Sequence, residues 1–128
     1  LLVADEKSNR DIFSMMLRQF GFHVIVAENG AIAWAMIKGL NGQEKEYLVA
    51  IVSDILMPEL IGMGLLVRVR ENSDFKSLPF IFLTASEEEF YELCANCFHV
   101  NGYLTKPIRS KDLFDKLSEI FPEKKLTA

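Results

Sequence analysis

Residues 47–54 read YLVAIVSD, seven mostly apolar residues followed by the carboxylate of Asp54. An apolar run of this length without alternation is typical of a strand buried on both faces of a parallel sheet. Pro58 follows shortly and stops regular structure, because it lacks a backbone N–H. Open α/β sheets place their sites outside the carboxyl ends of the strands, so the pattern puts Asp54 at such a position.

Strand and helix patterns alternate along the rest of the chain. The apolar runs expected as strands are 1–4, 22–27, 47–54, 80–83 and 100–104. The helices expected after them are 9–20, 31–40, 65–70, 87–97 and 110–121. Ser8 and Ser110 are the expected N-caps of the first and last helices, and the polar segment 41–46 is expected to be a loop. Five such units predict an α/β fold, a doubly wound parallel sheet with five helices on its two faces.

The 128 residues suit one domain, expected over 1–121, with 122–128 as a C-terminal tail or the start of a linker. The first residue is not Met, which suggests a fragment. A net charge of −4 argues against binding of nucleic acid or of an anionic membrane by this segment. No apolar run approaches the roughly 20 residues of a membrane span, and no signal peptide is visible.

Cys94 and Cys97 form a Cys-x-x-Cys pair, which could be redox-active. The pair falls in a predicted helix and no second pair or suitably spaced His accompanies it, so two partly buried thiols are the favoured interpretation. Nothing in the sequence suggests a disulfide framework, and we therefore expect a cytoplasmic protein.

Four of the five predicted strands end in a chemically distinctive residue: Asp5 with Glu6, Asp54, Thr84 and Lys106. Gathered carboxylates stay ionised only beside a positive charge, and Mg²⁺ prefers such oxygen ligands while keeping several waters. A lysine ammonium and a hydroxyl would complete a site in which a carboxylate accepts a phosphoryl group. Each residue alone has a commoner interpretation, such as a helix cap or a solvated loop. The prediction depends on their joint placement at successive strand ends.

In these features the sequence resembles the receiver domains of the two-component response-regulator family, from Leu1 to about Phe121. The residues that carry the resemblance are the acidic pair, Asp54 followed by Met57-Pro58, Thr84-Ala85 and the run YLTKP at 103–107. The resemblance implies a flavodoxin-like sheet with strand order 2-1-3-4-5. It also implies a phosphorylation-controlled signalling switch that catalyses only its own phosphorylation and dephosphorylation and is not otherwise an enzyme.

The family's metal and acceptor residues can be carried over position by position. Asp54 would accept the phosphoryl group from a histidine kinase or a phosphotransfer protein. Glu6 and Asp54 would bind Mg²⁺ directly with the backbone carbonyl of Leu56, and Asp5 would act through a metal-bound water. Glu6 stands where Asp is more usual, and its extra methylene would shift the metal or admit a water without inactivating the site.

The family's switch residues match as well. Lys106 would pair with the phosphoryl group, Thr84 would swing toward it, and Tyr103 would turn inward as Thr84 moves. The face formed by the fourth helix, fifth strand and fifth helix would then change for a downstream effector or output domain, or for a homodimer. The added charge of about −2 supplies the pull on local donors.

Four further positions bear on details of the match. Ile61 replaces a usual Asp and is expected to alter how the third helix begins, and His99 stands where Gly commonly ends the fourth helix. At a left-handed position His99 would cost about 1 kcal/mol, unless the loop differs. Ser86 and Leu56 flank the phosphoryl site and are expected to set the phosphoryl lifetime.

Three other functions remain open at this point. The first is an interaction module on the same fold that is not phosphorylated in practice. The second is a phosphohydrolase with an Asp nucleophile, which usually wants a second carboxylate two residues later, where this chain has Leu56. The third is a flavin or dinucleotide binder, disfavoured because no Gly-x-Gly-x-x-Gly follows the first strand.

Overall fold

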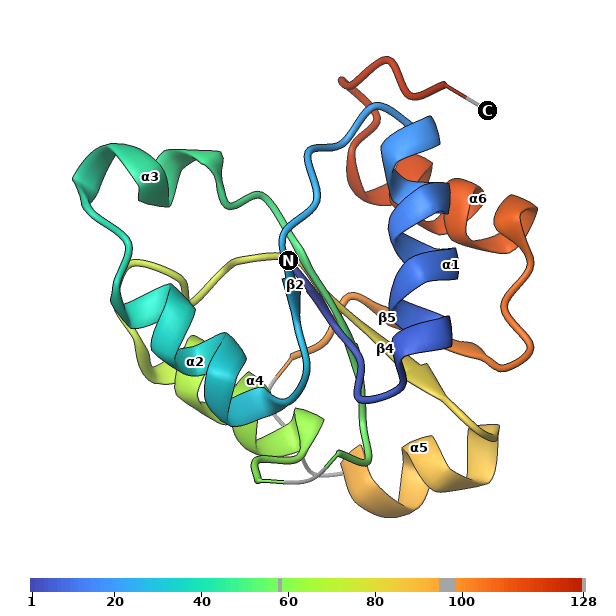
Figure 1. The fold of residues 1–128 in the computed structure, drawn as a ribbon, viewed down its shortest axis with the longest axis horizontal. Coiled ribbons are helices and arrows are strands. Elements are labelled where there is room, and N and C mark those ends of the chain that lie inside the picture. Colours follow the sequence, from blue (N-terminus) through green and yellow to red (C-terminus); the bar gives the residue numbers. More distant parts are fainter. Residues whose placement is uncertain (58, 95–98, 128) are drawn as a thin grey trace.

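A single parallel sheet forms the centre of the molecule in the computed structural model (Figure 1). The structure describes residues 1–57, 59–94 and 99–127. The strand order is β2-β1-β3-β4-β5, with every neighbouring pair parallel. The strands are β1 (Leu2–Val3), β2 (Val26–Ala27), β3 (Ile51–Asp54), β4 (Phe80–Thr84) and β5 (Gly102–Thr105). The predicted doubly wound sheet is therefore confirmed, including its order.

Helices cover both faces of this sheet (Figure 1). The described elements are α1 (Lys7–Gln19), α2 (Gly30–Lys38), α3 (Gly42–Tyr47), α4 (Gly62–Glu71), α5 (Glu87–Cys94) and α6 (Ser110–Ile120). One core cluster joins the sheet to α2 and α4, with Phe90 of α5 packed against it, and the other joins the sheet to α1 and α6. The part of the fourth predicted helix beyond Cys94, up to residue 97, includes residues outside the described ranges.

Strands β3 and β4 are buried along their whole length, as expected for central strands of a parallel sheet. Phe80 and Phe82 belong to the cluster on the α2–α4 side, whereas Ile81 and Leu83 belong to the α1–α6 side. Full burial of one such side chain contributes about 1.5–3 kcal/mol. Both faces therefore anchor the two strands that carry Asp54 and Thr84.

The segment expected as a loop over 41–46 is instead the short helix α3, so that prediction was wrong. A reciprocal capping box begins it: the Asn41 side chain accepts from the Glu44 backbone N–H at 2.8 Å, and the Glu44 carboxylate accepts from the Asn41 N–H at 2.9 Å. Tyr47, expected as the first residue of the strand over 47–54, is the last residue of α3, and β3 begins only at Ile51. The described residues therefore form six helices, one more than the five expected.

Two expected N-caps were also wrong. Ser8 and Ser110 lie within α1 and α6, whose N-cap residues are Glu6 and Arg109, and neither cap makes a side-chain hydrogen bond to the helix. The strand expected over 22–27 is confined to β2, because its only partner, β1, is itself two residues long.

The C-terminal segment turns back onto the domain. The backbone N–H of Thr127 donates to the carbonyl of Phe20 at 3.1 Å, and Leu126 packs against the α1–α6 core cluster. The described part of the tail, up to Thr127, is therefore docked on the domain. Cys97 and the side chain of Cys94 lie outside the described part of the chain, so their expected burial stays a prediction.

Candidate functional site

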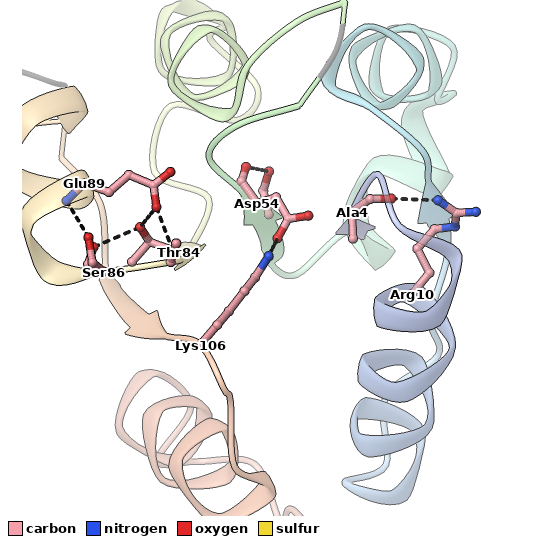
Figure 2. Close-up of polar contacts among 9 residues, drawn as sticks. Ala4, Arg10, Asp54, Thr84, Ser86, Glu89 and Lys106 are labelled. Atoms are coloured by element: carbon pink, nitrogen blue, oxygen red, sulfur yellow. Dashed lines mark hydrogen bonds and ion pairs between the residues drawn. The ribbon is translucent and has the colours of Figure 1, made fainter.

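The carboxyl edge of the sheet brings Asp54, Thr84 and Lys106 to three neighbouring strands. In the parallel register Asp54 pairs with Leu83 and Thr84 with Thr105, so the strand ends lie level. The backbone N–H of Lys106 donates to the carbonyl of Thr84 at 2.7 Å and fixes the start of the loop after β5. Figure 2 shows the Lys106 side chain reaching across to Asp54.

Asp54 is a buried carboxylate, only 2% exposed. Its Oδ1 lies 2.8 Å from Nζ of Lys106, whose side chain is 32% exposed. Neither Asp54 oxygen has a hydrogen-bond partner of good geometry among the described residues. Burial raises the pKa of Asp54 and outweighs the ion pair with Lys106, which lowers it. This carboxylate therefore retains unused acceptor capacity in a place where unpaired charge is costly.

The loop after β3 folds tightly against Asp54. The backbone N–H of Gly62 donates to the carbonyl of Ile55 at 2.6 Å. A Cβ at Gly62 would lie 2.3 Å from the backbone oxygen of Asp54, so only glycine fits this approach. Leu56 lies on the same loop with its side chain exposed. Ile61 is the N-cap residue of α4 and makes no side-chain cap, and its expected effect on how the helix begins stays a prediction.

The acidic pair lies at the exposed end of β1. Burial is the main cause of the raised pKa of Asp54, and Asp5 acts on it in two opposed ways: its backbone N–H lowers this pKa, and its negative charge, the smaller effect, raises it. Glu6 is exposed, and as the N-cap residue of α1 it leaves its carboxylate uncommitted to the helix. Within the described ranges no group of three or more acidic, His or Cys side chains gathers closely enough to hold a metal ion. The predicted metal ligands therefore stay a prediction.

The Thr84 side chain is 1% exposed and contacts α5 rather than Asp54 (Figure 2). Its Oγ1 lies 2.6 Å from Oε2 of Glu89 and 3.0 Å from the carbonyl oxygen of Ser86. The backbone N–H of Ala85 donates to the same Oε2 at 2.7 Å, and the Glu89 N–H donates to Oγ of Ser86 at 3.0 Å. Sequence reasoning missed Glu89, although Ser-x-x-Glu is a capping-box signal.

Tyr103 also contacts α5. Its hydroxyl donates to Oε1 of Glu87 at 2.6 Å, and its ring stacks on Phe90 with centroids 4.1 Å apart. The hydrogen bond to Glu87 raises the pKa of Tyr103. The ring is therefore held against the first two turns of α5.

His99 does not occupy a left-handed position, since Glu59, at φ 71°, is the one non-glycine residue with positive φ in the described ranges. The loop differs from the expected pattern instead, and its His99 carbonyl accepts from Nε of Arg70 at 2.8 Å. Within the described ranges, no hydrogen bond or ion pair joins the His99 side chain to Asp54, Thr84 or Lys106.

A five-stranded flavodoxin-like sheet whose carboxyl edge carries a buried Asp paired with a Lys, beside a Thr, defines a class of α/β signalling domains. The family model described as the response regulator receiver domain matches residues 1–118. The chain belongs to this family, and the predicted resemblance is confirmed. Members of the family are signalling domains of two-component systems rather than enzymes in the usual sense, and in general they interact with histidine kinases and downstream effectors.

Known relatives include proteins of very different length. Chemotaxis protein CheY1 of Helicobacter pylori is 33% identical over 122 residues, which cover 94% of this chain and 94% of CheY1. The 3',5'-cyclic-nucleotide phosphodiesterase regA of Dictyostelium discoideum is 31% identical over 123 residues, and there the match spans only 15% of the relative's length. The family therefore includes both small proteins of this size and segments of larger ones.

A solved structure gives the same fold. The receiver domain of sensor histidine kinase PA1611 from Pseudomonas aeruginosa PAO1 superimposes with a TM-score of 0.79 and 27% identity, covering 92% of each chain. That structure holds a magnesium ion coordinated in its active-site cleft.

No helix in the described part of this chain is long and apolar enough to cross a membrane.

Proposed function

We propose that the chain is a phosphorylation-controlled switch in which Asp54 accepts a phosphoryl group. The supporting observation is a buried carboxylate that is paired with Lys106 and makes no other well-aligned hydrogen bond among the described residues. A carboxylate oxygen of Asp54 forms a bond to phosphorus while the phosphorus–nitrogen bond to the donor histidine breaks, and the released imidazole takes up a proton. Lys106 offsets charge on the phosphoryl oxygens. The donor is a histidine kinase or a phosphotransfer protein.

The residues near Asp54 fit a magnesium ion. Mg²⁺ is commonly held by one or two carboxylates and keeps several waters, so it needs no cage of three side chains. The Asp54 carboxylate, the Glu6 carboxylate, which makes no cap to α1, and the backbone carbonyl of Leu56 would hold it, with Asp5 acting through a water. When bound, the ion would neutralise charge on the transferred phosphoryl group. The magnesium in the PA1611 receiver domain supports this assignment.

The response to phosphorylation would run through Thr84 and Tyr103. Thr84 would leave α5 and donate to a phosphoryl oxygen, and Tyr103 would turn inward. The face that then changes is α5–β5–α6, the fourth helix, fifth strand and fifth helix of the sequence prediction once α3 is counted. A downstream effector, an output domain or a second copy of the chain would bind there. The boundary after residue 121, the cytoplasmic location and the absence of nucleic-acid binding stay predictions.

The test is phosphorylation by acetyl phosphate, with intact mass as the readout. We expect the wild type to gain one phosphoryl group with Mg²⁺ and none without it, and Asp54→Asn to gain none. The acyl phosphate should then hydrolyse slowly without a partner. No gain, together with no binding of beryllofluoride, would favour the interaction module that is not phosphorylated.

A further inference from the structure

We infer that Glu89 is a positioning residue, which holds the Thr84 hydroxyl away from Asp54 and so opposes the phosphorylated arrangement. The inference rests on the proposed function of Asp54. It assigns to one residue of α5 a quantitative influence on how tightly Asp54 retains a phosphoryl group. Neither Asp54 nor Lys106 contacts Glu89 in the described hydrogen bonds, so Glu89 acts through Thr84.

The contact between the two side chains is strong for its kind. A hydroxyl has one proton to donate, and Oγ1 of Thr84 lies 2.6 Å from the Glu89 carboxylate. Hydrogen bonds from a hydroxyl to a carboxylate are shorter and roughly twice as strong as neutral ones. The carbonyl of Ser86, at 3.0 Å, is the weaker of the two acceptors. Because Thr84 is buried, water does not compete for this proton.

Glu89 is itself held in place. Its Oε2 accepts from the Ala85 backbone N–H at 2.7 Å, and its own N–H donates to Oγ of Ser86 at 3.0 Å. The carboxylate therefore loses one of two described donors, not both, when Thr84 leaves. A phosphoryl oxygen on Asp54 and Oε2 of Glu89 compete for the same proton, and the equilibrium depends on their relative strength as acceptors.

The preceding residue, Glu88, supplies a matched control. Glu88 lies in the same first turn of α5, is exposed, and makes no side-chain hydrogen bond or ion pair within the described ranges. Glu88→Gln removes the same charge from the same helix end as Glu89→Gln. Any effect of the helix dipole or of net charge is thus common to both variants.

The experiment follows the Thr84 methyl group by NMR while Mg²⁺ and beryllofluoride are titrated. Three-bond couplings report the Thr84 χ1 rotamer before ligand is added. A neutral amide is a weaker acceptor, so Glu89→Gln should raise the ratio of inward to outward Thr84 by roughly 3- to 10-fold. By linkage the beryllofluoride Kd should fall by up to the same factor. Glu88→Gln should match the wild type in both measurements.

A Thr84→Val background separates positioning from a structural role. Valine keeps the shape of threonine but has no hydroxyl, so Glu89→Gln should leave beryllofluoride affinity unchanged there. Equal effects of Glu89→Gln and Glu88→Gln, or an effect that persists with valine, would overturn the inference. If the wild type binds no beryllofluoride, the proposed function of Asp54 fails. The Thr84 χ1 rotamer then tests by itself whether Glu89 positions Thr84. An unchanged χ1 in Glu89→Gln overturns the inference, and a shifted χ1 supports it.

Discussion

Replacing Asp54 by Asn should make the protein more stable at neutral pH. The wild type keeps an ionised carboxylate at 2% exposure, with one ammonium beside it and no well-aligned hydrogen bond in the described structure. Burial of such a charge costs several kcal/mol. The substitution removes that cost, loses an ion pair worth about 1 kcal/mol to a partly exposed lysine, and leaves an amide whose own burial costs about 1–3 kcal/mol.

We expect the free energy of unfolding to rise by about 1–2 kcal/mol, which corresponds to a rise in Tm of about 3–8 °C for a domain of this size. The pKa of Asp54 is raised in the folded state, so its ionisation opposes folding. The gain should therefore be small below about pH 4, the unfolded pKa, and should grow as pH rises through the folded pKa. Mg²⁺ should reduce the stability difference between Asp54→Asn and the wild type, because it would stabilise only the wild type.

Thermal and urea unfolding at pH 4 and pH 7, without Mg²⁺, measure this difference. Asp74→Asn is the matched control, since Asp74 forms an equally short ion pair with Lys45 at 2.8 Å but is 52% exposed. That variant should change stability little at either pH. An Asp54→Asn protein that is less stable than the wild type at pH 7, or whose advantage is independent of pH, would refute the reasoning.

Two further substitutions probe the surroundings of the acceptor. Lys106→Met leaves the Asp54 carboxylate without its counter-charge and should lower stability at pH 7 by about 1–2 kcal/mol in urea unfolding, a loss that shrinks toward pH 4. Gly62→Ala places a Cβ 2.3 Å from the Asp54 backbone oxygen and should cost about 2–3 kcal/mol and slow phosphorylation by acetyl phosphate. Gly42→Ala, which meets nothing within 4 Å, is its control and should be neutral or slightly stabilising.

The features that could be predicted from the sequence were those with strong local sequence patterns. The apolar runs ending at Asp54 and Thr84 are continuous because both faces of β3 and β4 are covered, so periodicity and strand ends located the edge of the sheet. The Lys106–Asp54 ion pair then follows from topology, since neighbouring parallel strands end level. This part needed no knowledge of side-chain conformations.

The missed features depend on competition between weak signals. Residues 41–46 are polar throughout, and an isolated six-residue helix is marginal, so its capping box at Asn41 and Glu44 was outweighed by composition. Ser8 and Ser110 were plausible caps, but helix ends commonly shift by one or two residues. The role of Glu89 was hidden for another reason: three consecutive glutamates begin α5, and only the folded backbone determines which of them reaches Thr84.

The carboxylates of Asp54 and Glu89 differ in the donors they accept from, and in the proposed function this contrast would let a single phosphoryl group act as a switch. Asp54 lacks well-aligned donors, whereas Oε2 of Glu89 accepts from both Thr84 and Ala85. In the proposed function, phosphorylation adds a charge of about −2 at Asp54, and the Thr84 hydroxyl would join Lys106 as a donor to it. Because the hydroxyl has only one proton, it cannot satisfy both acceptors at once. The two arrangements are therefore discrete, and the stronger acceptor sets which one is populated.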